Sequence, residues 1–140
     1  MTQPPAVPTF LLDTNANINS LAAAPQGQPF LLLAGAPTAV SVITEIELRY
    51  GVAANPGDQL RLGQLTHLLS RWRPRAIDPA VTSAFSPVVA ATIAAGQKPR
   101  KRMNDLMVAA TALAHGMTLV TNDLGLTHAV SRLVPVQALY

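Results

Sequence analysis

Apolar and polar residues follow one another along the chain in short blocks that predict strands. Residues 9–13 form an apolar run that ends on an acid, which is typical of a buried parallel strand with a polar group at its carboxyl end. Residues 37–43 and 117–121 predict two further strands. A short fourth strand is predicted at 134–136, at an edge of the sheet, because Pro135 has no N–H to donate.

The segments between these strands predict helices. A helix is expected from Thr44 to about Ala54, because Thr44 and Glu47 stand at the spacing of a capping box. Residues 58–72 predict a second helix, whose apolar positions fall on roughly one face. These positions are Leu62, Leu65, Leu68, Leu69 and Trp72.

Two more helices are predicted in the second half of the chain. One begins at Asp78, a helix cap followed by proline, and runs towards Gly96, with a kink or a division expected at Pro87. The other runs from Asn104 to His115 and ends at the glycine that follows. Strands that alternate with helices predict a three-layer α/β/α fold around a central parallel sheet.

Length and composition limit the chain to one domain. With 140 residues, of which 49% are hydrophobic, the chain can build one core but hardly a second. We expect a tail over residues 1–8 and a single domain over 9–140. No apolar run reaches the roughly 18 residues that span a bilayer. The start has no signal-peptide pattern and cysteine is absent, so we expect a cytoplasmic protein without a membrane partner.

Basic side chains gather in two short segments of a chain with a formal net charge of +3. They are Arg71, Arg73 and Arg75 in the first segment, and Lys98, Arg100, Lys101 and Arg102 in the second. Such clusters can follow the phosphates of a nucleic acid, whose binding is largely electrostatic. The alternative is a solvated loop that keeps an apolar protein soluble.

Four of the seven acids fall at comparable places in the alternating pattern. Asp13 ends the first predicted strand, and Glu47 lies in the first turn of the helix after the second. Asp105 starts the last long helix, and Asp123 follows the third strand by two residues. In an open parallel sheet the carboxyl ends of strands and the starts of the next helices share one edge, where ligands bind. The four carboxylates are therefore expected to converge.

Converging carboxylates repel one another, so such a cluster needs protonation or a cation. Oxygen donors without cysteine, and without histidine nearby in sequence, favour Mg²⁺ or Mn²⁺ over zinc. A metal held in this way activates water and neutralises a phosphoryl oxygen. The pattern thus indicates hydrolysis of a phosphodiester.

Each of the four acids also has a purely structural explanation. Asp13 and Asp123 could be turn residues or helix caps, and Glu47 could complete the capping box of its helix. Asp105 is favoured in a first helical turn by the helix dipole. The other acids are expected at the surface or as caps, and they are Glu45, Asp58 and Asp78.

Four blocks occur in the order of the successive motifs of PIN-domain proteins. They are Leu-Leu-Asp-Thr-Asn (11–15), Ser-Val-Ile-Thr-Glu-Ile-Glu-Leu-Arg-Tyr-Gly (41–51), Asn-Asp-Leu-Met-Val-Ala-Ala-Thr-Ala-Leu-Ala-His-Gly (104–116) and Thr-Leu-Val-Thr-Asn-Asp (118–123). The chain resembles this family from residue 9 to 136, and in particular the VapC toxins of bacterial toxin–antitoxin pairs. The resemblance implies a Mg²⁺- or Mn²⁺-dependent endoribonuclease that acts on RNA, frequent homodimers, and a VapB-like antitoxin that blocks the site.

The resemblance also assigns roles to individual residues. It implies that the catalytic and metal-binding acids are Asp13, Glu47, Asp105 and Asp123. It implies that the acids are supported through hydrogen bonds by Thr14, Asn15, Ser41 and Thr121. The expected RNA-binding residues precede Asp105 and are Lys98, Arg100, Lys101 and Arg102. The chain departs from many relatives after Asp123, where Leu-Gly-Leu-Thr-His replaces a segment with an aspartate–phenylalanine pair.

Other functions fit parts of the pattern. Histidine catalysis would use residues away from the motifs, namely His67, His115 or His128. A phosphatase with an aspartyl nucleophile also begins with an apolar strand that ends in aspartate, but it normally has a second acid where Asn15 stands. The non-enzymatic alternative keeps the PIN fold and binds RNA or an antitoxin without cutting RNA.

Overall fold

The structure is a computed structural model that describes residues 8–21 and 36–139. Of the predicted tail, only Pro8 falls within these ranges. The elements are β1 (Phe10–Leu12), α1 (Thr14–Leu21), β2 (Thr38–Val40), α3 (Val42–Ala54), α4 (Gln59–Arg71), α5 (Pro79–Ala94), the 3₁₀-helix η1 (Pro99–Arg102), α6 (Met103–His115), β3 (Thr118–Val120), α7 (Leu124–Val130) and β4 (Val136–Gln137).

The described strands form one parallel sheet in the order β2-β1-β3-β4. The predicted fourth strand is present at an edge of the sheet. It covers Val136–Gln137 and not 134–136, so Pro135 precedes the strand. Leu12 of β1 is in register with Val40 of β2 and Val120 of β3. These three strands end level with one another, so the residues that follow them lie along the same edge.

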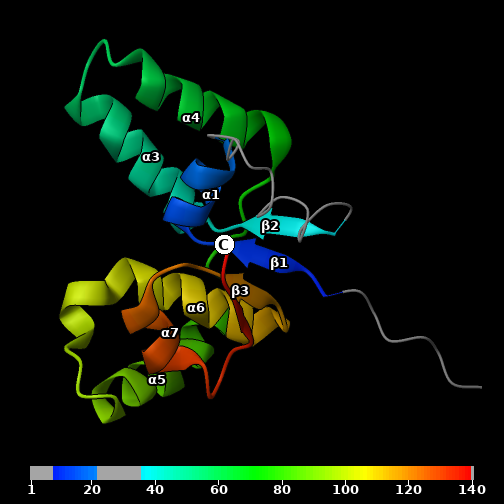
Figure 1. The fold of residues 1–140 in the computed structure, drawn as a ribbon, viewed down its shortest axis with the longest axis vertical. Helices are drawn as coiled ribbons and strands as arrows, with labels where there is room; N and C mark the ends of the chain where they lie inside the picture. Colours follow the sequence, from blue (N-terminus) through cyan, green and yellow to red (C-terminus); the bar gives the residue numbers. More distant parts are fainter. Residues whose placement is uncertain (1–7, 22–35, 140) are drawn as a thin grey trace, which may run out of the picture.

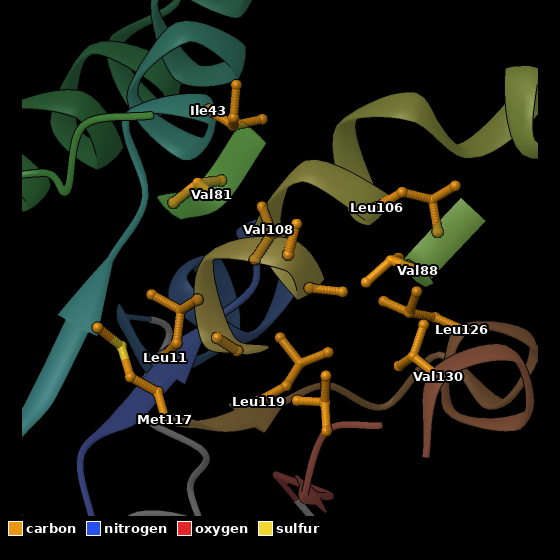
Figure 2. Packing of buried hydrophobic residues seen from close by; sticks show 14 of the residues in the cluster. Leu11, Ile43, Val81, Val88, Leu106, Val108, Met117, Leu119, Leu126 and Val130 are labelled. Atoms are coloured by element: carbon orange, nitrogen blue, oxygen red, sulfur yellow. The ribbon is translucent and has the colours of Figure 1, made fainter. Parts of the chain in front are cut away.

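Helices cover both faces of the sheet, with α1, α3 and α4 on one side and α5, α6 and α7 on the other (Figure 1). The strands explain this division because successive side chains point to opposite faces. Leu11 and Leu119 join the larger core, with α5, α6 and α7 (Figure 2), whereas Leu12 and Val120 join the smaller one, with α1, α3 and α4. The predicted three-layer α/β/α fold is confirmed.

The start of α3 differs from the prediction. Ser41 caps this helix, because its hydroxyl accepts a hydrogen bond from the Ile43 N–H at 3.0 Å. The helix therefore begins before Thr44, and the predicted capping box of Thr44 and Glu47 is wrong. The physical reason is that a serine already stands at the end of β2 and satisfies the first N–H groups of the helix. Glu47 is left to make other contacts.

The predicted apolar face of α4 is only partly correct. Leu65 and Leu68 are buried, but Leu62 and Leu69 are 44% and 42% exposed. Leu65 and Leu68 pack in the smaller core with residues of α1, α3 and β2. The buried face of α4 is therefore narrower than the predicted apolar face. Trp72 ends the helix and donates its indole N–H to a threonine of β2.

The two helices predicted in the second half of the chain agree with the structure near their ends. Asp78 caps α5 by accepting from the Val81 N–H at 2.9 Å, and Gly116 ends α6 with a φ of 64°. Pro87 does not divide α5, which is one helix. Neither α1 nor α7 was predicted; α1 is rich in asparagine, a weak helix former, and α7 has only 7 residues.

No single helix in the described ranges is long and apolar enough to cross a membrane. Pro79–Ala94 and Pro99–His115 meet this test of length and composition only together, across a bend of 119°. Both segments contribute side chains to the larger core.

Candidate active site

Four acids from different elements meet at the carboxyl edge of the sheet. Asp13 follows β1, Glu47 lies in the second turn of α3, Asp105 in the first turn of α6, and Asp123 caps α7. Burial first, and then the charges of Asp123 and Glu47, raise the pKa of Asp13. Burial also raises the pKa of Asp105, followed by the charges of the other three acids. The four carboxylates therefore lie near enough to one another for their charges to interact.

Asp13 is held from two sides. Its Oδ1 accepts a hydrogen bond from the Ala16 N–H at 2.7 Å, so this acid also caps α1. The Thr121 side chain lies beside the same carboxylate. Both contacts lower the pKa of Asp13, but they do not offset its burial, since only 6% of the residue is exposed. The carboxylate is thus fixed in place while its charge stays poorly compensated.

Glu47 is held by a chain of hydroxyl groups. The Thr14 hydroxyl donates to Oε1 of Glu47 at 2.6 Å. Because a hydroxyl has one hydrogen, the 3.2 Å contact between the Thr14 and Thr44 hydroxyls has Thr44 as its donor. Sequence reasoning missed Thr44 as a site residue and assigned it to a helix cap. The available signal was its position three residues before Glu47, on the same helix face.

The other predicted supporting residues differ in their surroundings. Thr121 contacts Asp13, and its hydroxyl also accepts from the Asp123 N–H at 3.1 Å. Ser41 is fully buried and caps α3. Asn15 is exposed, and within residues 8–21 and 36–139 it makes no hydrogen bond to an acid.

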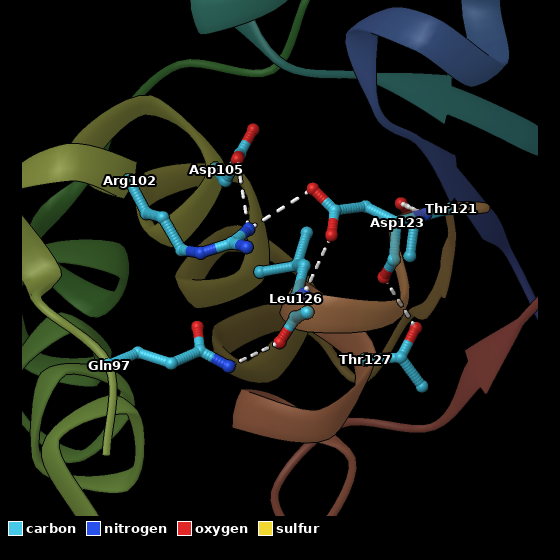
Figure 3. A network of polar contacts seen from close by, with 8 residues as sticks. Gln97, Arg102, Asp105, Thr121, Asp123, Leu126 and Thr127 are labelled. Atoms are coloured by element: carbon cyan, nitrogen blue, oxygen red, sulfur yellow. Dashed lines mark hydrogen bonds and ion pairs between the residues drawn. The ribbon is translucent and has the colours of Figure 1, made fainter. Parts of the chain in front are cut away.

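Asp123 is the most strongly compensated acid of the site. Its Oδ1 accepts from the Leu126 N–H at 3.0 Å, and its Oδ2 accepts from Arg102 Nη1 at 3.1 Å (Figure 3). Arg102 Nη1 also lies 3.7 Å from Oδ2 of Asp105. Partial burial pushes the pKa of Asp123 up, but the hydrogen bonds from Leu126 and Arg102 outweigh it, and the pKa is lowered. The segment that departs from the family pattern therefore still places Asp123 beside Arg102, which also approaches Asp105.

The second basic segment lies beside the acids. A pocket of about 390 Å³ is lined by Glu47, Arg100, Lys101, Arg102, Met103, Asn104 and Asp105. Arg100 and Lys101 are exposed, and Lys98 stands just before η1, outside this lining. The first basic segment makes other contacts. The Arg71 guanidinium lies over the Trp72 ring, 5.3 Å from its centroid, and the Arg75 backbone pairs with Ser41.

The histidines do not contact the acidic site. His67 packs edge-on against the Trp72 ring, with 5.8 Å between the centroids. His115 pairs with Asp78 at 2.9 Å and joins the end of α6 to the start of α5. His128 lies in the last turn of α7. These positions give no geometry for histidine catalysis at the four acids.

The donors fit a hard divalent cation in their chemistry, because they are carboxylates with poorly compensated charge at Asp13 and Asp105. Their arrangement is less complete. Among the described residues, no group of three or more histidine, cysteine, aspartate or glutamate side chains is placed to hold a metal ion. Of the described basic side chains, Arg102 is the one paired with Asp105 and Asp123.

Known proteins are similar to this chain in sequence and in fold. Residues 10–130 match the PIN domain. The chain is similar to Ribonuclease VapC4 of Mycobacterium tuberculosis, with 40% identity over 92 residues, which is 64% of this chain and 69% of that protein. Its fold is similar to VapBC2 from Rickettsia felis bound to a promoter DNA fragment, with a TM-score of 0.71, 24% identity, and coverage of 93% of this chain and 98% of that chain. It is also similar to FitAcB from Neisseria gonorrhoeae, with a TM-score of 0.66, 27% identity, and coverage of 91% and 95%. Because the match extends from β1 to α7, the chain belongs to the PIN domain family.

Proposed function

We propose that this PIN domain is a Mg²⁺- or Mn²⁺-dependent endoribonuclease and the toxin of a VapBC-type toxin–antitoxin pair. The observation that supports the proposal is that four acids lie at one edge of the sheet, at the ends of strands or in the first two turns of helices. Two of them, Glu47 and Asp105, line a pocket together with basic side chains. The similarity to a protein named as a ribonuclease supports the choice of RNA as substrate.

In the proposed mechanism, Asp13, Glu47 and Asp105 would hold the ion, and Asp123 would assist. A bound ion supplies an activated water and neutralises charge on the phosphoryl oxygen. The hydroxyl of Thr14 fixes the Glu47 carboxylate at 2.6 Å. Orientation of this kind matters because residues behind metal ligands set the ligands' direction and basicity.

The RNA backbone is proposed to lie along the pocket in front of η1. Arg100 and Lys101 line this pocket and are exposed, so their charges can meet phosphates without first leaving a protein partner. Lys98 and Arg102 belong to the same basic segment and complete the proposed RNA-binding set. Phosphate contacts of this kind position the strand but carry no sequence information.

Removal of the metal tests the function directly. The purified chain is expected to shorten a labelled RNA in Mg²⁺ or Mn²⁺, to lose this activity completely in EDTA, and to regain it when Mn²⁺ is added in excess. Cleavage products are followed on a denaturing gel. Asp13→Asn, purified in the same way, controls for contaminating ribonuclease. A non-catalytic RNA-binding module would instead shift the RNA in a native gel, with or without EDTA, and never shorten it.

Loss of one hydroxyl behind the acids should lower activity. Thr14→Val keeps the size of the side chain but removes the donor to Glu47. We expect cleavage to fall by about 10- to 100-fold, as for other partners of metal ligands. Initial rates measure the effect, and Thr14→Ser should restore most of it.

The matched control for this substitution is Thr82→Val on the exposed surface of α5, where the hydroxyl bonds only to the Pro79 carbonyl. This variant should cleave like wild type. Equal rates for Thr14→Val and wild type would show that the hydroxyl does not orient Glu47.

A protein partner is proposed together with the toxin role. Large apolar side chains are exposed on α3 and α4, including Ile46 at 54%, Tyr50 at 75% and Leu60 at 71%. Groups of such residues mark protein-binding surfaces, and a VapB-like antitoxin or a second copy in a homodimer would cover them. We also propose a cytoplasmic location, because the proposed substrate is RNA.

A further inference from the structure

Arg102 points into the acidic site, unlike its neighbours in the basic segment. Its guanidinium lies between Asp105 and Asp123, with Nη1 at 3.1 Å from Oδ2 of Asp123 and 3.7 Å from Oδ2 of Asp105 (Figure 3). The side chain is 25% exposed, whereas Arg100 and Lys101 are exposed to solvent. One cation of the chain itself thus contacts two of the four acids.

Gly125 provides the space in which this guanidinium lies, and we call this space the seat of Arg102. A Cβ at this position would collide with Nη2 of Arg102 and would lie 3.2 Å from its Cζ and 3.3 Å from Oδ1 of Asp123. Gly125 is within α7 and is not among the glycines with positive φ, so its backbone conformation does not require glycine. Glycine inside a helix is unfavourable, and the approach of Arg102 is the contact that explains it here.

A second contact, made by Gln97, holds the turn of α7 that carries Gly125. Gln97 Nε2 donates to the Gly125 carbonyl at 2.8 Å, which joins α7 to the segment just before η1. Arg102 ends that same η1. The hydrogen bond from Gln97 therefore holds the helix that carries Gly125 close to the segment that carries Arg102.

We infer that Arg102 is a built-in counter-ion that competes with the divalent cation and must leave its seat on Gly125 before Asp105 and Asp123 can bind the ion. The inference rests on the proposed metal site. A carboxylate oxygen that accepts from a guanidinium is directed at that donor, so ion binding to the same oxygen requires the guanidinium to move. The apparent affinity for the metal is then reduced by the fraction of molecules in which the seat is filled.

Two variants empty the seat in different ways. Arg102→Gln removes the guanidinium together with its charge. Gly125→Ala keeps every charge of the site and displaces the guanidinium by contact with the new methyl group. The movement is easy because the atoms in conflict are at the end of a flexible side chain, and alanine is favourable inside a helix.

The experiment is a titration of the metal-free full chain with Mn²⁺, in which free Mn²⁺ is measured by electron paramagnetic resonance. Both variants are expected to bind Mn²⁺ about tenfold more tightly than wild type, within the usual range of coupling between two ligands. Lys101→Gln removes a nearby charge without touching the acids, and its affinity should stay within about twofold of wild type. Circular dichroism confirms that each variant is folded.

The outcomes separate the inference from the function on which it rests. Equal Mn²⁺ affinity in wild type, Arg102→Gln and Gly125→Ala would overturn the competition and leave the metal site intact. A gain in Arg102→Gln alone would also overturn it, because the effect would then come from the lost charge. If no variant bound Mn²⁺, the metal site itself would be wrong, and the inference with it.

Discussion

Asp13→Asn is expected to reduce RNA cleavage by at least about a hundredfold while the protein stays folded, since changes at residues that only orient metal ligands already cost 10- to 100-fold. Asparagine keeps an oxygen that can accept from the Ala16 N–H, so the cap of α1 is retained. It lacks the negative charge that the proposed ion requires. Initial cleavage rates in Mn²⁺ measure the loss, and circular dichroism checks the fold.

The same substitution should stabilise the metal-free protein at neutral pH. Burial, and then the charges of Asp123 and Glu47, raise the pKa of Asp13 above its usual value of 3.8. A carboxyl group with a raised folded pKa contributes its full stability below the unfolded pKa, and this contribution is lost as the pH rises through the folded pKa. Asp13→Asn has no such loss. Urea unfolding should therefore show the variant gaining on wild type as the pH rises from about 4 to 8.

Glu45→Gln is the control for both effects. Glu45 lies on the same helix as Glu47, but it pairs with Arg49 at 2.6 Å on the surface. Its replacement should leave cleavage unchanged and stability within about 0.5 kcal/mol of wild type. If this variant lost as much activity as Asp13→Asn, the glutamate of the site would be wrongly assigned.

The layers of the fold could be predicted because the pattern of the strands is local. A run such as Leu11 and Leu12 followed by an acid shows a strand buried on both faces, and the sheet places the two leucines in different cores. The same reasoning led to the edge where Asp13 and Asp123 meet, because parallel strands end on one side of a sheet. Neither step needs knowledge of side-chain contacts.

The parts that escaped prediction depend on contacts between distant residues. The helices α1 and α7 have weak sequence signals and start at Asp13 and Asp123, which cap them through the Ala16 and Leu126 N–H groups. The sequence pattern offers two explanations for these acids, a helix cap and a site residue. The structure shows the caps, and because each cap lies at the carboxyl edge of the sheet, a cap does not exclude the site role.

Arg102 is a further case in which sequence position is not enough. Nothing in the basic segment distinguishes it from Arg100, and its partner Asp123 lies 21 positions away. Only the packed structure shows that one of these cations faces inward, because the glycine opposite it leaves room. Charge patterns predict that a surface is basic, but they do not predict which charge pairs with which.

Leu126→Ala is expected to lower the free energy of unfolding by about 2–5 kcal/mol, the range for a buried leucine. Leu126 is fully buried and packs in the larger core with Val88, Leu106 and Val130 (Figure 2). Its truncation removes apolar contacts and leaves a cavity under a helix of 7 residues. Chemical denaturation followed by circular dichroism measures the change.

Leu124→Ala is the matched control, because it removes the same atoms two positions earlier on the same helix. Leu124 is 83% exposed, and its loss should change stability by less than about 0.5 kcal/mol. Leu126 also donates its N–H to Asp123 at 3.0 Å, so the core leucine holds the helix that places this acid in the site. Equal destabilisation by the two substitutions would mean that α7 does not dock on the core through Leu126. If Leu126→Ala destabilises the protein far more than Leu124→Ala, the position of Asp123 depends on the packing of Leu126 in the core, because Asp123 caps the helix that Leu126 anchors.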